Sequence, residues 1–387
     1  KSEYSRKAIT LSVSIIALAT ASSFTTVHAQ QAQPGDANCP IVDGEAICSG
    51  DLSDGVTAPP DSGIDTLTIQ DVTGDIAPPG YFGVGATRTD GDLTINVEEG
   101  VVIRTYDDPN IANPAQGIIG ITQNGYDLTI NSGADIFVDG NGQPAVGIEG
   151  AMFDGSSVLS ISNTGDVDIT TSADFMHAIL GRALNSTGDV FIANSGALNV
   201  TSTYQGERGS SLTGIFASSE LGGGEIWISN SGDIDVTTDP GSFDTDFQGL
   251  AAAIATNVFG EASTTEIINA GALSINGDNA YGIVGFTNNT STDANSIVTI
   301  NNVGAVSVDG DYANAILAQS TGTAVDLEVT NTGALTLGTK AESNGIYVWN
   351  QATEGLLSVT NSGTIANSDG GDTTGIGLYG IGLTTGG

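Results

Sequence analysis

The chain has 387 residues, including 54 Gly and 10 Pro, and its 8 Lys and Arg against 45 Asp and Glu give a formal net charge of −37. This acidity disfavours nucleic acids and anionic lipid surfaces as partners, and Gly without a strict three-residue period excludes collagen. The composition indicates no cofactor. Calcium is the one ion that the acidity leaves open, although no calcium-loop spacing supports it.

Residues 1–29 have the features of an export signal. Arg6 and Lys7 form a positive start, residues 8–21 are mostly apolar, and Val27 and Ala29 place small residues just before Gln30. We therefore expect cleavage before Gln30 and a mature chain that works outside the cytoplasm. After this stretch no run is long and apolar enough to cross a bilayer as a helix.

Residues 30–80 differ in composition from the rest of the chain. They hold the only two cysteines, Cys39 and Cys48, together with paired prolines, and only residues 66–70 have a clear strand pattern. A cysteine pair in an exported chain favours a disulfide that closes a small loop; two free thiols or a poor metal site are the alternatives. Because a solenoid needs an end that covers its core, we predict an N-terminal cap here.

From residue 81 the chain is built on a repeated phrase, Asn-x-Gly, with alternating apolar residues on both sides. The alternation predicts two short strands, and Asn and Gly predict a turn between them because both tolerate positive φ. We expect a structural turn in which equivalent Asn side chains stack from one unit to the next. The eight copies are Asn131 and Gly133, Asn163 and Gly165, Asn194 and Gly196, Asn230 and Gly232, Asn269 and Gly271, Asn302 and Gly304, Asn331 and Gly333, and Asn361 and Gly363.

A third apolar run completes each unit. Its central Ile stands 17 residues before the next repeat Gly in six cases of seven, whereas the leg from Gly to the following Ile varies from 12 to 22 residues. Three strands per unit predict an all-β, right-handed parallel β-helix of about nine coils over residues 81–387. We also expect the array to be truncated at Gly387. A β-propeller or a sandwich is the structural alternative.

The start of the mature chain carries a resemblance to a known family. Residues 39–50 read Cys-x8-Cys-Ser-Gly and are followed by Asp54, Gly55 and Val56. With the export signal and the repeat, this resembles the passenger domain of an autotransporter (type V secretion) of a Gram-negative bacterium. The resemblance implies passage through an outer-membrane translocator barrel, either beyond Gly387 or in a separate chain, and a β-helix at the cell surface.

The sequence offers little for catalysis. His177 is the only histidine after the export signal, so a Ser-His-Asp triad would have to use it. Candidate carboxylates stand out only through their abundance; they are Asp107, Asp108, Asp166, Asp168, Asp233 and Asp235. We therefore predict no enzymatic activity and a turn or surface role for His177. The rival hypothesis is a polysaccharide lyase or hydrolase, which would need a basic residue beside calcium or two suitably spaced carboxylates.

Binding has more support. Phe191 and Trp227 occupy equivalent outward positions in neighbouring units, where adjacent aromatic rings can hold a sugar or an apolar side chain, or simply stiffen the sheet. The longest variable legs, residues 201–213 and 237–250, belong to the same units and add candidate binding residues. These are Tyr204, Arg208, Phe243 and Phe247.

We therefore predict a secreted or surface-displayed protein that acts in adhesion or as a structural stalk. Its partner would be a host or neighbouring-cell surface, recognised through protein or glycan. A purely structural surface component is the second rival.

Overall fold

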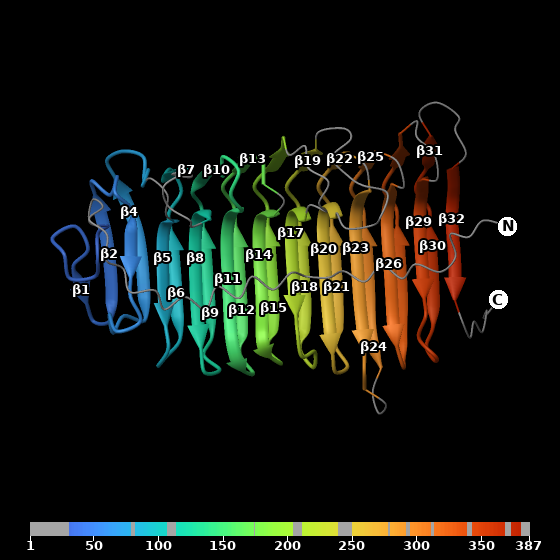
Figure 1. Ribbon diagram of the computed structural model, residues 1–387, viewed down its shortest axis with the longest axis horizontal. Coiled ribbons are helices and arrows are strands. Elements are labelled where there is room, and N and C mark those ends of the chain that lie inside the picture. The colour runs from blue at the N-terminus through green and yellow to red at the C-terminus, as the bar shows by residue number, and fades with distance from the viewer. Residues whose placement is uncertain are drawn as a thin grey trace.

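The computed structural model describes residues 31–78, 82–106, 114–173, 175–203, 211–238, 250–277, 279–291, 295–310, 313–338, 343–367 and 373–380. These residues form an all-β parallel solenoid of about nine turns, as the three-strand repeat predicts. Each full coil gives one strand to each of three sheets along the long axis (Figure 1). The described part of the chain has no helix that could cross a membrane. The predicted export signal lies outside it.

Sheet 1 contains the strand before each Asn-x-Gly turn. In spatial order its strands are β1 (Ile41–Val42), β2 (Glu45–Gly50), β4 (Thr66–Val72), β6 (Leu93–Val97), β9 (Leu128–Ser132), β12 (Val158–Asn163), β15 (Asp189–Asn194), β18 (Glu225–Asn230), β21 (Thr264–Asn269), β24 (Ser296–Asn302), β27 (Val325–Asn331) and β30 (Leu357–Asn361). Apart from the antiparallel pair of β1 and β2, the paired strands of the solenoid are parallel.

Sheet 2 contains the strand after each turn, and sheet 3 contains the third apolar run. The strands of sheet 2 are β7 (Val102–Tyr106), β10 (Asp135–Asp139), β13 (Val167–Thr171), β16 (Leu198–Ser202), β19 (Ile234–Thr238), β22 (Leu273–Asn276), β25 (Val306–Asp309), β28 (Leu335–Leu337) and β31 (Ile365–Asn367). Those of sheet 3 are β3 (Val56–Ala58), β5 (Phe82–Arg88), β8 (Ala115–Gln123), β11 (Ala145–Gly155), β14 (Phe175–Ser186), β17 (Ser211–Ser219), β20 (Leu250–Gly260), β23 (Ala280–Asn289), β26 (Asn314–Gly322), β29 (Ser343–Asn350) and β32 (Thr373–Gly380).

The core is one column of stacked apolar side chains inside the coils. The central Ile of the third run illustrates it: Ile148, Ile179 and Ile215 pair in register and are fully buried. One cluster of such residues extends from Cys39 to Ala352. Each inward side chain packs on its counterpart in the next coil, about 4.8 Å away, so burial is shared between neighbouring coils.

The segment before the repeats adds strands to the solenoid itself. β4 confirms the strand expected at residues 66–70, while β2 joins sheet 1 and β3 joins sheet 3, neither of which the sequence pattern had indicated. Cys39 and Cys48 are disulfide-bonded and fully buried within the core cluster. That this segment serves as a cap stays a prediction.

The Asn-x-Gly turns build a ladder of side-chain amides at the corner between sheets 1 and 2. Each Asn donates from Nδ2 to the carbonyl of the Gly two residues on, at 2.7–2.9 Å. Except at the last rung, Nδ2 also donates to Oδ1 of the Asn in the next coil, again at 2.7–2.9 Å. The seven rungs are Asn163, Asn194, Asn230, Asn269, Asn302, Asn331 and Asn361.

The Gly of each turn is required for a different reason from the one expected. None of the seven ladder Asn residues, and none of the Gly residues two positions after them, has a positive φ, so the prediction of positive-φ turns is wrong. Instead, the backbones of successive coils touch at this corner. A Cβ on Gly271, for example, would overlap the carbonyl oxygen of Gly232. Only a residue without a side chain allows this approach.

The first copy does not join the ladder. Asn131 is exposed and pairs in register with Asn96 and Ser162, and its Nδ2 donates to Asn96 Oδ1 at 2.9 Å. Ser132 stands opposite Asn163 instead, so the eighth rung expected at Asn131 is displaced by one residue. As a result Asn163 Oδ1 and Ser132 Oγ are both buried without a hydrogen-bond partner.

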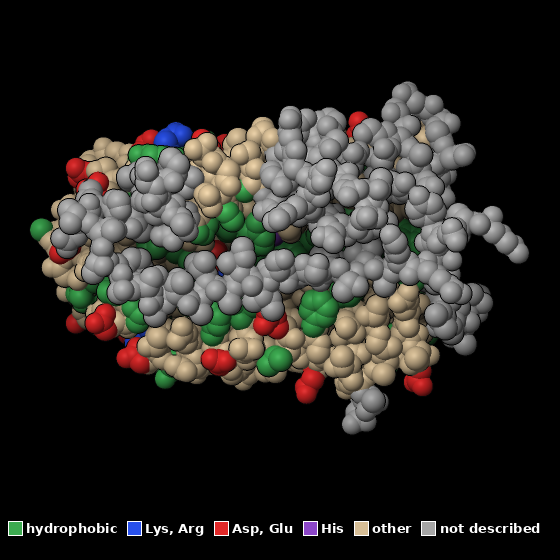
Figure 2. Space-filling model, viewed as in Figure 1, with side chains coloured by type: hydrophobic (Ala, Val, Ile, Leu, Met, Phe, Trp, Pro, Cys, Tyr) green, Lys and Arg blue, Asp and Glu red, His purple; other side chains and the backbone are tan. Residues whose placement is uncertain are grey.

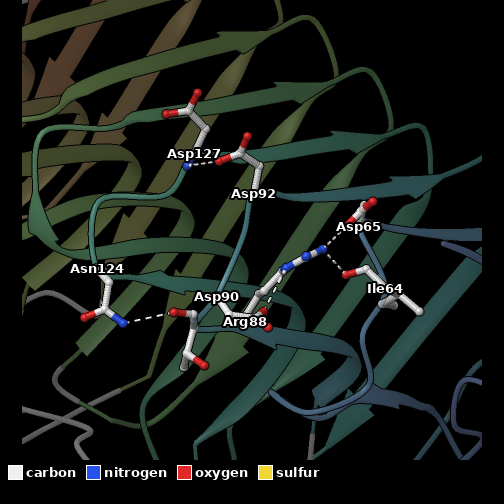
Figure 3. A network of polar contacts seen from close by, with 8 residues as sticks. Ile64, Asp65, Arg88, Asp90, Asp92, Asn124 and Asp127 are labelled. Atoms are coloured by element: carbon white, nitrogen blue, oxygen red, sulfur yellow. Dashed lines mark hydrogen bonds and ion pairs between the residues drawn. The ribbon is translucent and has the colours of Figure 1, made fainter.

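Aspartates tie the coils together at the corner between sheets 3 and 1. Asp127 N–H donates to Asp92 Oδ1 at 3.0 Å, and Val158 N–H donates to Asp127 Oδ1 at 2.8 Å. Figure 3 shows the start of this series beside Arg88, which forms ion pairs with Asp65 and Asp90. Part of the acidity of the chain therefore serves as acceptors for backbone N–H groups of the next coil.

Gly271→Ala tests the close approach at the turn. We expect a loss of about 1–3 kcal/mol in unfolding free energy, because the new Cβ forces neighbouring coils apart. Gly74→Ala is the matched control, since Gly74 has ordinary φ and a Cβ added there would meet no other atom within 4 Å; it should change stability by less than about 1 kcal/mol. Equal effects in urea unfolding would contradict the contact argument.

Ser132→Asn tests whether the ladder can be extended. An amide at position 132 can donate to the unpaired Asn163 Oδ1, as each ladder Asn does to the next, so we expect a gain of about 1 kcal/mol. Ser132→Ala should change stability by less than about 0.5 kcal/mol, because the hydroxyl has no partner. Chemical unfolding of both variants checks the prediction, and a destabilised Ser132→Asn protein would contradict it.

Candidate binding face on sheet 3

The predicted aromatic pair lies on the outer face of sheet 1. Phe191 in β15 pairs with Trp227 in β18, as expected, and both side chains are partly buried. Their neighbours in the same row are Ser160 and Glu266, so the apolar surface is confined to two coils. The other candidate binding residues, Tyr204, Arg208, Phe243 and Phe247, lie outside the described residues.

Three of the four candidate carboxylates that the structure describes accept hydrogen bonds from the next coil, and the fourth, Asp235, accepts one within its own strand. Asp166 Oδ1 accepts from Ala197 N–H at 2.9 Å, and Asp233 Oδ1 accepts from Ala272 N–H at 2.9 Å. Asp168 accepts from the side chain of Asn199 at 2.5 Å, and Asp235 from that of Thr237 at 2.9 Å. These contacts give the four carboxylates a structural use. Asp107 and Asp108 lie outside the described residues.

Sheet 3 carries a second apolar cluster on its outer face, separate from the core. In β14, for example, Ile179 packs into the core and Leu180 into this second cluster. Its central row follows the strand register through Leu180, Phe216, Ala255, Val284 and Leu317. Figure 2 shows hydrophobic side chains along the middle of one face of the molecule, with acidic side chains mainly at its margins.

A polar cluster interrupts this apolar face on β8, β11, β14 and β17. Glu149 continues the row of Leu180, and its carboxylate accepts from Gln116 Nε2 at 2.6 Å and pairs with the guanidinium of Arg182. His177 Nδ1 lies 2.6 Å from Thr213 Oγ1. The exposed fractions of Gln116, Glu149, His177 and Thr213 are 5% or less. Gln116, Glu149, Arg182, His177 and Thr213 are called the polar cluster below.

Aromatic rings enclose the imidazole of His177. The ring of Phe175 meets it edge-on at 4.3 Å between centroids, and the ring of Phe216 stacks on it at 5.3 Å. Burial, with a smaller contribution from the positive charge of Arg182, lowers the pKa of His177 to about 3. The imidazole is therefore neutral at neutral pH. The prediction of an ordinary turn or surface role for His177 is wrong, because the side chain lies in a buried polar cluster.

Several polar atoms of this face have no partner. His177 Nε2 and Arg182 Nε are buried and make no hydrogen bond, and the same holds for both Oδ1 and Nδ2 of Asn257. Asn257 lies in the row of Arg182, two strands further on. A buried, unpaired polar group costs about 1–3 kcal/mol. Such groups are uncommon in folded proteins, and each needs a partner such as a water molecule or a ligand.

Each arginine among the described residues forms an ion pair. Arg88, Arg104 and Arg182 each pair with an acidic side chain, and only Arg182 does so on the outer face of sheet 3. Within the described ranges, no three His, Cys, Asp or Glu side chains are grouped so as to hold a metal ion. The polar cluster therefore consists of hydrogen-bonding groups around one neutralised ion pair.

Comparison with known proteins finds no matching family model, no similar curated protein and no similar solved structure. The function of this chain must consequently be inferred from the geometry of the solenoid and its outer faces.

The depressed pKa of His177 predicts a pH dependence of stability. The unfolded chain binds a proton at His177 below about pH 6.5 and the folded chain does so only below about pH 3, so stability falls as the pH is lowered between these values. This contribution is at most about 1.4 kcal/mol per pH unit.

The variant His177→Gln lacks this titration. Between pH 7 and pH 4, urea unfolding should show a steeper loss of stability for the original chain than for the variant, because all other ionisable groups are shared. Parallel pH profiles for the two proteins would contradict a buried, neutral His177.

Proposed function

We propose that the chain is an exported, surface-displayed passenger-like solenoid that binds a partner surface, and that the outer face of sheet 3 is its binding face. The partner is a host or neighbouring cell, met through protein or glycan. On this proposal the chain reaches the surface of a Gram-negative bacterium through an outer-membrane translocator, as the resemblance to autotransporter passengers implies.

The observation that carries the proposal is the second apolar cluster with its embedded polar groups. Solenoid stability is supplied by the inner column and by the ladder of Asn side chains, so an ordered outer row on one sheet is not needed for stacking. The side chains of the row lie outside the core, although 5% or less of each is exposed in this structure. Apolar side chains bordered by polar residues on an outer face are typical of interaction sites. A purely structural stalk would not need this second apolar cluster.

Catalysis on polysaccharides receives less support from the same geometry. Hydrolysis by paired carboxylates needs two of them flanking the bond, and the polar cluster contains one, Glu149, which is already paired with Arg182. Of the other candidate carboxylates that are described, Asp166, Asp168 and Asp233 accept hydrogen bonds from the next coil, and Asp235 accepts one from Thr237. Binding is therefore the function that the face favours.

Val284→Asp tests the binding face. The substitution places a charge in the middle of the outer row, and we expect attachment of the exported protein to target cells to fall about tenfold or more, since burying an unpaired charge against a partner is costly. Thr299→Asp is the matched control, because Thr299 lies on the outer face of sheet 1 in the next strand, β24. Its attachment should be unchanged.

Flow cytometry of labelled protein on a panel of cells measures attachment, and circular dichroism confirms that both variants retain their β structure. Equal attachment by Val284→Asp and the original chain would contradict the assignment to sheet 3. Loss of attachment in the Thr299→Asp protein alone would move the binding face to sheet 1.

A further inference from the structure

We propose that the polar cluster, extended along sheet 3 to Asn257, is a binding site for an uncharged oligosaccharide. This inference rests on the proposed binding function and names the ligand class of its face. It applies to the exported chain, which we predict to begin at Gln30.

The unpaired atoms define what a ligand must offer. Arg182 Nε can only donate, so it needs an acceptor; Asn257 presents both a donor and an acceptor. His177 Nε2 donates or accepts according to which ring nitrogen carries the proton, and Thr213 at Nδ1 allows both arrangements. Hydroxyl groups serve all of these atoms, because each one both donates and accepts.

The apolar surroundings favour a ligand that is not polar throughout. The rings of Phe175 and Phe216 lie against the imidazole, and Leu180 and Ala255 continue the row around them. A sugar ring combines hydroxyl groups at its edge with an apolar C–H face, which packs on such side chains. A water cluster would satisfy the polar atoms but not this apolar surface.

Charge excludes an anionic ligand. The positive charge of Arg182 is already balanced by Glu149, and the imidazole of His177 is neutral at neutral pH, so the polar cluster offers no free cation. The rest of the chain is strongly acidic, with a net charge of −37, and repels polyanions. A cationic ligand finds no unpaired carboxylate in the cluster, because Glu149 is shared by Gln116 and Arg182.

The spacing of the strands indicates an elongated ligand. Arg182 and Asn257 lie in the same outer row and are separated by two strand spacings, about 10 Å. A ligand that reaches both must run along the solenoid axis across β14, β17 and β20. On β17 the residue between them in register is Ser218, and Phe216 stands two residues away in the neighbouring row. A linear oligosaccharide would therefore contact polar atoms at both ends, with an aromatic ring beside its path.

The test uses the exported chain and two sets of probes. The neutral probes are immobilised linear oligosaccharides of glucose, galactose, mannose and N-acetylglucosamine, and the anionic probe is polygalacturonate. We expect saturable binding to at least one neutral probe and none to polygalacturonate. Absence of binding to every neutral probe, or a preference for polygalacturonate, would overturn the proposal.

Asn257→Leu separates a ligand site from a structural role. The side chain is fully buried with both polar atoms unpaired, so an apolar residue of similar size should leave thermal stability unchanged or raise it. Affinity for the neutral probe should nevertheless fall about tenfold, the loss expected for one or two hydrogen bonds. Unchanged affinity in a folded Asn257→Leu protein would overturn the proposal.

A second variant and a control complete the design. The paired change Glu149→Gln with Arg182→Gln removes the ion pair without leaving a lone charge, and it should reduce affinity by at least about tenfold. Trp227→Ala on sheet 1 should leave affinity unchanged; loss of sugar binding in that variant alone would overturn the assignment to sheet 3.

Cell attachment distinguishes the carbohydrate inference from the proposed function. If the exported chain attaches to cells through sheet 3 but binds none of the neutral sugars, the carbohydrate inference fails and the proposed function stands. If the chain neither attaches to cells nor binds sugars, both fail.

Discussion

The structure depends on the contact between successive coils at the corner between sheets 1 and 2. There the backbones approach so closely that a Cβ on Gly196, Gly232 or Gly271 would overlap the carbonyl of the coil before it. The Nδ2 group of the buried Asn two residues earlier donates both to the Gly carbonyl of its own turn and to Oδ1 of the Asn in the next coil. The strand register between neighbouring coils is therefore fixed at this corner by both steric contact and hydrogen bonds. A slip of one residue would leave a buried amide unpaired and make two backbones clash.

The contact at the Asn-x-Gly corner also explains why the rest of each coil can vary in length. With register held at the Asn-x-Gly corner, the leg from sheet 2 to sheet 3 can lengthen without disturbing the stack. The long variable legs follow β16 and β19, on the side where sheet 2 leads into sheet 3. The segment from sheet 3 to the next turn is nearly constant in length because it includes the two strands that flank the aspartate corner, where Asp127 and Asp189 receive N–H groups from the next coil.

Much of this fold could be predicted from the sequence because its constraints repeat. Alternation around Ile228 and Ile234 predicts both strands of a unit, and the constant spacing from Ile to Gly predicts three strands per coil. The turn mechanism was predicted wrongly, since Asn-x-Gly with positive φ and Asn-x-Gly with touching backbones have the same sequence. The copy at Asn131 is already shifted in the sequence, with its apolar residues at Leu128, Ile130, Ile136 and Val138. The pairing of Ser132 with Asn163 adds that the ladder begins one coil later.

The candidate site could not be predicted from the sequence, and the reason is geometric. Its contacts join residues 33 to 36 positions apart, Gln116 with Glu149, Glu149 with Arg182, and His177 with Thr213, which no local motif can mark. Runs such as Ile179 and Leu180 hide the outer row as well, because two adjacent apolar residues look like one continuous core segment.

Sheets 1 and 2 use polar residues for stacking, through the Asn ladder and through aspartates such as Asp166 and Asp233 that accept from the following coil, although single buried atoms such as Asn163 Oδ1 are unpaired there too. On sheet 3 the buried polar atoms of His177, Arg182 and Asn257 are left unpaired while the apolar row around them is ordered. A face that the stack does not need, and that carries the cost of unpaired groups, is where selection for binding would act.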